Sequence, residues 1–456
     1  MELFEQITAS VSSFLWGWPM IILLLGTHIF LTIRLKFPQR KIFTAIRLSF
    51  KKDPDSEGDV SQFGALATSL AATIGTGNII GVATAVAFGG PGAVFWCWLT
   101  GVFGIATKYA EGLLAIKYRV KTASGEMLGG PMYALERGLK QKWLGILFCI
   151  FTALAAFGIG STVQANSIAL LMQETYGISA HLTGIVVALG IALVIFFGVK
   201  GIARVCMTLV PLMAILYIGG CIYILFLNHA YLGEALKLII SSAFTPHAAG
   251  GGFLGTSVML AARYGIARGL FSNESGLGSA PIVAAAAQTR NPVRQALVSS
   301  TGTFWDTVII CALTGLVLVT SVLAFPDIDY TQGGALTKAA FGKIPYVGTS
   351  ILAIGILTFA FSTILGWGYY SGKAIEYLGG KKLLRVYRVI WISSIYFGST
   401  MNLQAVWNIA DSVNALMADT FFHCLYTFKV LTLTLPNGMK LLIYRERHKQ
   451  NDVGRR

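Results

Sequence analysis

Long apolar stretches limit what this chain can fold into more than any other feature. Segments 182–197, 205–227 and 296–324 hold very few charged residues, and their lengths are comparable to the roughly 20 apolar residues that cross a bilayer core. Only 12% of the 456 residues are charged, about half the ~25% typical of soluble domains. The sequence therefore predicts an all-α polytopic integral membrane protein.

Hydropathy in a window of about 19 residues predicts about 11 transmembrane helices. The expected spans are approximately 12–33, 62–88, 91–118, 143–172, 181–199, 205–228, 250–285, 295–325, 346–371, 387–402 and 405–434.

The distribution of Lys and Arg predicts the orientation, because cytoplasmic loops are enriched in both. With the N-terminus outside, the external gaps hold only Lys237, Lys338 and Lys343, and the basic tail 435–456 is cytoplasmic. The net charge of +15 is thus spread over the cytoplasmic loops rather than gathered in one patch, which argues against a nucleic-acid partner.

The segment 68–81, TSLAATIGTGNIIG, makes a poor continuous helix in the middle of the second span. Its glycines each cost roughly 1 kcal/mol relative to Ala in a helix. Close packing through small residues is one explanation. We favour a second, in which unwound backbone lines a binding cavity, because Gly75, Thr76, Gly77 and Asn78 combine glycines with polar side chains.

The segment 268–281, RGLFSNESGLGSAP, interrupts the seventh span in the same way. Glu274 is a candidate coupling carboxylate, since an ionisable residue inside a membrane is usually functional. It is equally a candidate cap that accepts backbone N–H bonds at the broken helix. Glu111, Asp306 and Asp411 are further candidate carboxylates, or partners of basic residues at a membrane edge, such as Lys108 for Glu111.

The positions of the two interruptions predict an inverted repeat. They fall in the second and seventh spans, so spans two to six and seven to eleven form matching halves of opposite orientation. The predicted division is an N-terminal helix and basic loop (1–60), a first repeat (61–228), a second repeat (229–434) and the tail (435–456).

At these residues the sequence resembles the alanine or glycine:cation symporters, also called sodium:alanine symporters. The motifs that carry the resemblance are ALATSLAATIGTGNIIGVATAVAFGGPGAVFWCW (65–98), GGPMYALERGL (129–139), FGIGSTVQANSIA (157–169), RGLFSNESGLGSAP (268–281), FAFSTILGWGYY (359–370) and WNIADSVNALMA (407–418). The resemblance implies the five-plus-five inverted-repeat fold of neurotransmitter:sodium symporters with one extra N-terminal helix.

The resemblance also implies where an amino acid would bind. Backbone and side chains of the second span and an amide of the fourth would meet its charged groups, and an apolar wall would enclose its side chain. The implied substrate residues are Thr76, Gly77, Asn78, Gln164, Phe271, Ser275, Leu277 and Trp367. Ser275 and Leu277 depart from the usual NEAGMGSAP pattern of the family, where Ala and Met stand.

The resemblance further implies a sodium ion between the first broken helix and a hydroxyl pair on the ninth span. Ser362 and Thr363 fit that pair, with carbonyls near Thr73 and Gly75 opposite, and hard cations prefer such oxygen ligands. Alternatively, the two hydroxyls bond only to their own helix.

The sequence therefore favours sodium-coupled symport of alanine or glycine by alternating access in a cytoplasmic (inner) membrane. Open alternatives are proton coupling through Glu274, and sodium-coupled uptake of glutamine or serine. No repeated filter indicates a channel, and the scattered histidines form no catalytic cluster. Neither an enzyme nor a cofactor besides the coupling ion is expected.

Overall fold

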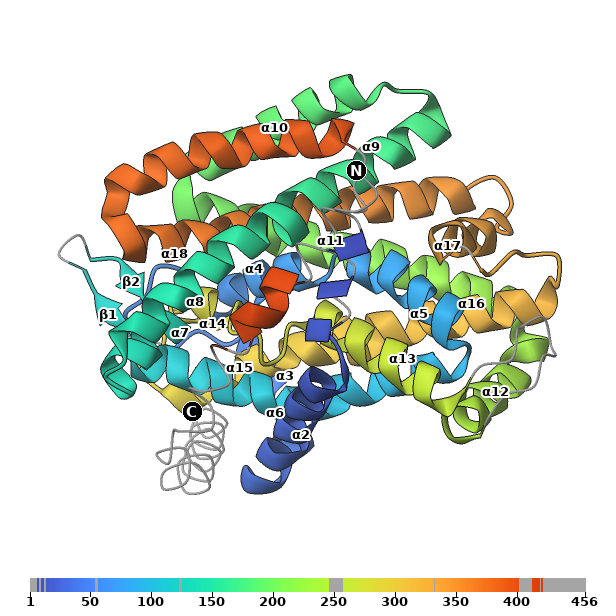
Figure 1. Cartoon of the computed structure of the whole chain (residues 1–456), viewed down its shortest axis with the longest axis horizontal. Coiled ribbons are helices and arrows are strands. Elements are labelled where there is room, and N and C mark those ends of the chain that lie inside the picture. The colour runs from blue at the N-terminus through green and yellow to red at the C-terminus, as the bar shows by residue number, and fades with distance from the viewer. Residues whose placement is uncertain are drawn as a thin grey trace, which may run out of the picture.

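The computed structural model describes residues 6–7, 10–11, 14–53, 56–122, 125–245, 257–331, 333–401, 412–418 and 420 (Figure 1). In these ranges the regular structure is helical, apart from one short hairpin and an isolated bridge. The hairpin strands, β1 (Val120–Lys121) and β2 (Met127–Leu128), pair antiparallel with Val120 opposite Leu128. The expected span 405–434 and Asp411 fall almost wholly outside the described residues.

Among the described residues from Trp18 to Leu227, fourteen helical segments follow one another. They are α2 (Trp18–Arg34), η1 (Pro38–Lys41), α3 (Ile42–Ser49), α4 (Gln62–Thr73), η2 (Gly77–Gly81), α5 (Val82–Gly89), α6 (Gly92–Lys117), α7 (Pro131–Tyr133), η3 (Ala134–Gly138), α8 (Lys142–Ala155), η4 (Ala156–Thr162), α9 (Val163–Tyr176), α10 (Ala180–Phe196) and α11 (Gly198–Leu227).

The described helical segments after Leu227 also vary in length. They are η5 (His229–Tyr231), α12 (Leu232–Phe244), α13 (Val258–Asn273), α14 (Pro281–Ala284), α15 (Pro292–Thr303), η6 (Phe304–Cys311), α16 (Ala312–Ala324), α17 (Gly333–Gly342) and α18 (Gly348–Thr400). The segments η2, η3, η4 and η6 are π-helical.

Four helical runs among the described residues are long and apolar enough to cross a membrane: Lys142–Tyr176, Gly198–Leu227, Pro292–Ala324 and Gly348–Thr400. Two bent pairs raise this to six if each pair counts as one span: α2 with the segment Pro38–Ser49, bent by 64°, and α4 with Gly77–Gly89, bent by 53°. The prediction of a membrane protein is thus supported, while the number 11 stays a prediction.

The expected ninth and tenth spans form one helical run, α18. Gly380 interrupts it with a φ of 68° and a ψ of −167°, a backbone conformation open to glycine and strained for other residues. The chain turns there, and the rest of α18 runs back beside α10 (Figure 1). The two spans predicted here are therefore the two arms of α18.

Helices from the two halves of the chain interleave. The helix α6 packs against α13 and α15, and α4 packs against α11 and the first arm of α18. Figure 1 shows α2 and α6 along one side of the molecule and α10 with the second arm of α18 along the other. Between them lie α4 and the short α14, so the two interrupted spans occupy the interior.

The polar linker before α4 is fastened to the chain that follows α14. Val60 pairs with Ala287, and the Gln288 N–H donates to the Val60 carbonyl at 2.8 Å. The Arg119 guanidinium donates to the carbonyls of Ala287 and Thr289 at 2.8 and 2.6 Å. These contacts hold the beginning of the first interrupted span against the end of the second.

Candidate functional site

The first interruption begins where α4 stops. Ile74 leaves the helix with a ψ of 91°, and the chain resumes in the π-helical η2. The Asn78 side chain closes this break from within, because its Oδ1 accepts the Gly75 N–H at 2.9 Å. The last carbonyls of α4 have no following turn to bond, as at any helix C-terminus.

Two hydroxyls on α18 lie against those carbonyls. Ser362 Oγ is 3.2 Å from the Ala71 carbonyl oxygen, and Thr363 Oγ1 is 3.1 Å from the same oxygen and 3.5 Å from that of Ile74. Both hydroxyls also lie 2.9 Å from the Phe359 carbonyl of their own helix. The result is a buried group of neutral oxygens, the chemistry that a small hard cation prefers.

The carbonyls in contact with the hydroxyl pair differ from those expected near Thr73 and Gly75. Thr73 Oγ1 bonds back to Ser69 and Leu70 of α4, because the helix continues through Thr73. Gly75 does lie at the pair: a Cβ on it would stand 2.6 Å from Thr363 Oγ1. The carbonyls that contact the hydroxyl pair are therefore those of Ala71 and Ile74, and a sodium site at this position stays a prediction.

The second interruption uses left-handed backbone. Helix α13 ends at Asn273, and Glu274, Gly276 and Gly278 follow with φ values of 52°, 90° and 80°. Glycine reaches this region at little cost, which explains the two glycines. The chain returns to helix only at Pro281, whose fixed φ suits a first helical position.

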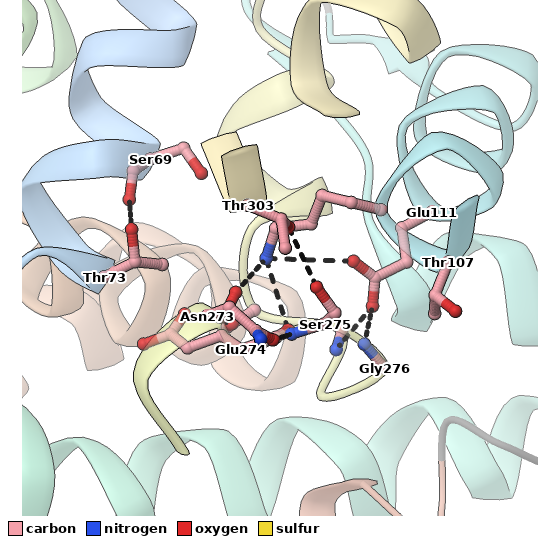
Figure 2. Close-up of polar contacts among 12 residues, drawn as sticks. Ser69, Thr73, Thr107, Glu111, Asn273, Glu274, Ser275, Gly276 and Thr303 are labelled. Atoms are coloured by element: carbon pink, nitrogen blue, oxygen red, sulfur yellow. Dashed lines mark hydrogen bonds and ion pairs between the residues drawn. The ribbon is translucent and has the colours of Figure 1, made fainter. Parts of the chain in front are cut away.

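Two buried charges on α6 hold this second break (Figure 2). The Lys108 ammonium donates to the carbonyls of Asn273 and Glu274 at 2.9 and 3.2 Å. Glu111 lies one turn further on, with Oε2 3.9 Å from the Lys108 nitrogen. Its Oε1 accepts the N–H groups of Gly276 and Gly278 at 2.8 and 3.2 Å. The pair thus satisfies carbonyls on one side of the break and amides on the other.

The contacts of the Glu274 carboxylate differ from those expected of a cap on the broken helix. Its carboxylate accepts from Ser279 Oγ at 2.5 Å and from Trp367 Nε1 at 3.0 Å, so its described contacts are side chains. The residue that accepts backbone N–H groups at this break is Glu111. The sequence had linked Lys108 with Glu111, but at a membrane edge, whereas both residues are about 1% exposed.

Asp306, on η6, connects the two breaks. It accepts from Asn78 Nδ2 at 2.7 Å on the first break and from Ser272 Oγ at 3.0 Å on the second. Thr307 Oγ1 is 2.6 Å from the same carboxylate. Both the oxygen and the nitrogen of the Asn78 side-chain amide are therefore bonded to protein groups. In this structure the Asn78 side chain holds the first break against η6.

Four of the expected substrate residues gather beside the first break. A Cβ on Gly77 would stand 3.3 Å from the Phe271 ring, and one on Gly75 would stand 3.6 Å from Gln164 Oε1. Thr76 Oγ1 and Gln164 Oε1 are buried and have no hydrogen-bond partner among the described residues. Buried polar atoms are usually paired, so these two oxygens mark a place where a polar ligand fits.

The remaining expected residues lie further along the second break. Trp367 bonds to Glu274 and packs against Gly160, where a Cβ would collide with the indole. Ser275 Oγ lies 2.9 Å from Thr303 Oγ1, which turns it toward α15. Leu277 is fully buried in the main hydrophobic core.

Two unwound spans that meet around buried polar groups in a helical membrane protein define a class, the secondary transporters that bind cargo at broken helices. The chain belongs to the sodium:alanine symporter family, which matches residues 1–451.

Relatives of known name span nearly the whole chain. It is 50% identical to the sodium/alanine symporter AgcS of Methanococcus maripaludis, over 91% of this chain and 92% of that one. It is 52% identical to an uncharacterized transporter of Haemophilus influenzae, over 91% of each chain. The probable sodium/glutamine symporter GlnT of Bacillus subtilis is 37% identical, over 91% of this chain and 86% of that one.

Solved transporters share the fold at low sequence identity. MhsT in complex with L-phenylalanine superposes with a TM-score of 0.54 at 16% identity, covering 85% of this chain and 99% of that one. A substrate-bound Na⁺-coupled sialic acid symporter gives 0.56 at 12% identity, covering 90% and 86%. These likenesses support the predicted transporter fold.

Proposed function

We propose that the protein is a sodium-coupled symporter of a small neutral amino acid, alanine or glycine. The observation that carries the proposal is the juxtaposition of two binding chemistries at the first break. A group of neutral oxygens suited to Na⁺ adjoins two unpaired buried polar oxygens suited to an ammonium group. Family membership and the 50% identity to a sodium/alanine symporter support the same reading.

The proposed sodium ligands are the Ala71 and Ile74 carbonyls with Ser362 and Thr363. A hydroxyl has one hydrogen and two lone pairs, so each of these side chains can keep its bond within α18 and still face a cation. Gly75 is needed beside them because any side chain there would collide with Thr363.

The proposed amino-acid site uses Thr76, Gly77, Gln164 and Phe271. The oxygens of Thr76 and Gln164 would accept from the ammonium group, and backbone N–H groups at the start of η2 would face the carboxylate, as helix N-termini do. The Phe271 ring and Trp367 would bound the side chain of the substrate. Ser275 and Leu277 would pack behind the residues that enclose the substrate side chain, since Ser275 contacts α15 and Leu277 lies in the core.

The proposal includes alternating access in the cytoplasmic membrane, with the N-terminus outside and the tail 435–456 inside. It also includes the five-plus-five inverted repeat over 61–228 and 229–434, with Na⁺ and the amino acid as co-substrates and lipid as the surrounding partner. Ion and substrate would bind with mutually increased affinity, because coupling between two sites is reciprocal.

The test is uptake of labelled alanine into proteoliposomes that contain the purified protein. An inward Na⁺ gradient is compared with an inward H⁺ gradient at matched membrane potential, and glycine, serine and glutamine serve as competitors. We expect uptake that requires Na⁺, is inhibited by glycine and is strongly reduced by Gln164→Ala. The matched control is Gln173→Ala, on the same helix α9 but largely exposed.

Other outcomes would replace the proposal. Uptake driven by the H⁺ gradient alone would make Glu274 the coupling group in place of the oxygens around Thr363. Competition by glutamine stronger than by glycine would move the substrate toward that named for GlnT.

A further inference from the structure

We propose that the ammonium group of Lys108 is a built-in cation that fills the break after α13, so that sodium is needed only at the break after α4. The inference rests on the sodium coupling proposed above. It assigns a role to a buried charge that neither the sodium site nor the amino-acid site uses.

Each break begins at the C-terminal end of a helix, where backbone carbonyls need partners. In each, a helix stops inside the protein and leaves carbonyl oxygens without intrahelical partners, at the end where the helix dipole is negative. At the first break these are the carbonyls of Ala71 and Ile74. At the second they are the carbonyl of Asn273 and that of Glu274, which also accepts the Leu277 N–H at 3.3 Å. A cation satisfies such carbonyls best.

The groups that face the two ends differ in charge. The first end meets only the neutral hydroxyls of Ser362 and Thr363 among its described partners, so the cation must come from outside. The second end meets the Lys108 ammonium at 2.9 and 3.2 Å. A lysine that is 1% exposed would be costly if it only filled space, because a buried charge needs close partners.

With Glu111 included, the oxygens around the Lys108 ammonium resemble the ligands of a bound cation. Its Oε2 has no hydrogen-bond donor within the described chain, and its nearest positive charge is Lys108 at 3.9 Å. Removal of the ammonium would leave this oxygen and the carbonyls of Asn273 and Glu274 around one vacated position. Carboxylate and carbonyl oxygens are the ligands that hard cations select, so Lys108→Met is expected to turn the position into a site for free Na⁺.

The experiment measures sodium binding directly, without a substrate. Purified full-length wild type, Lys108→Met, Lys108→Arg and the double variant Lys108→Met/Glu111→Gln are titrated with ²²Na⁺. Melting temperature is followed in NaCl and in choline chloride of equal ionic strength, because an ion that binds only the folded state raises it.

The double variant is the decisive control, since it removes the carboxylate together with the ammonium. We expect the binding stoichiometry to rise from about one ion in the wild type to about two in Lys108→Met, and to return to about one in the double variant and in Lys108→Arg. Lys108→Met should also gain a Na⁺-specific rise in melting temperature larger than that of the wild type.

Two results would overturn the inference. One is a Lys108→Met variant that binds the same number of ions as the wild type, and the other is a double variant that behaves as Lys108→Met does. If Lys108→Met is too unstable to purify, Lys108→Gln replaces it, and a melting temperature that responds to Na⁺ as the wild type does counts against the inference.

Failure of the proposed function gives a different pattern. A wild type without any Na⁺-specific response would reject sodium coupling. The role of Lys108 would still be decided by whether its removal creates a response that the wild type lacks.

Discussion

The two breaks at the centre of the protein are built from different chemistry. At the first, neutral hydroxyls face the carbonyls, the Asn78 amide bonds to the backbone and to the Asp306 carboxylate, and no described residue from Ile74 to Gly81 has a positive φ. The second holds Lys108 and Glu111 in contact with its backbone and contains three left-handed residues. Under the proposed function, the first break would exchange a ligand and the second would keep one conformation.

The largest expected effect tests the charged break. Glu111→Ala would leave the Lys108 ammonium buried without its carboxylate and the N–H groups of Gly276 and Gly278 without an acceptor. Loss of one partner of a buried pair costs about 3–5 kcal/mol, so we expect a large fall in melting temperature and poor yield of folded protein. The control is Glu234→Ala, at a residue in the first turn of α12. If Glu111→Ala were as stable as this control, Glu111 would not stabilise the second break.

The second prediction concerns the left-handed backbone that only the second break uses. Gly276→Ala places a Cβ at a φ of 90°, and left-handed backbone costs roughly 1–2 kcal/mol for residues other than glycine. Thermal unfolding should therefore start at a lower temperature. Gly26→Ala is the matched control: it lies in α2 with no atom within 4 Å of the added Cβ, and should stabilise the helix by up to about 1 kcal/mol. Equal effects of the two changes would contradict the assignment.

The third prediction tests whether the Thr363 hydroxyl contributes to sodium binding rather than to the stability of the fold. Thr363→Val keeps the shape of the side chain and removes an oxygen from the group around the Ala71 carbonyl. We expect at least a tenfold rise in the half-saturating Na⁺ concentration, about 1.4 kcal/mol, with little change in melting temperature. Thr358→Val, whose hydroxyl bonds only within α18, should leave sodium dependence unaltered. An unchanged Na⁺ requirement in Thr363→Val would remove this hydroxyl from the site.

The smallest expected effect lies at the surface. Lys121 donates to Glu57 at 3.0 Å, and this bond with the charge of Lys121 lowers the pKa of Glu57. A lowered pKa adds stability above the pKa of the unfolded chain, and this is lost as pH falls through the folded pKa. Both side chains are more than half exposed, where water screens such pairs.

Lys121→Ala should therefore lower the melting temperature slightly at pH 7 and leave it equal to that of the wild type under acidic conditions. A loss as large as that of Glu111→Ala would show that exposed and buried charges contribute alike. That outcome would remove the contrast between the surface and the second break.

The positions of both breaks could be predicted from the sequence because glycines and polar residues inside apolar spans are local signals. The hydroxyl pair on α18 was named from the family resemblance, because Ser and Thr inside a span are weak signals by themselves. The carbonyls opposite it were not predicted, since their register depends on how far α4 continues before Ile74 turns away. A change of one or two residues at a helix end selects different oxygens.

Sequence reasoning named Lys108, Glu111 and Asp306 as candidates but did not predict that they contact the two breaks. Lys108 and Glu111 are three residues apart on α6, a spacing that equally suits an exposed pair. Only the packing of α6 against α13 buries them and brings them to Asn273 and Gly276, residues more than 160 positions away. The same holds for Asp306, whose bond to Asn78 depends on how η6 crosses η2.

The π-helical turns have a consequence for how the site tolerates insertions and deletions. A π-turn holds one residue more than an α-turn between bonded groups. Asn78 lies in η2, Asp306 lies in η6, and Gln164 follows η4 by two residues. Deletion of one residue from η4 would restore the α-helical repeat and rotate Gln164 by about 100° about the axis, away from Gly75. In these three segments the residue count is itself under constraint, so a relative that binds the same cargo should differ there by substitution and keep the same length.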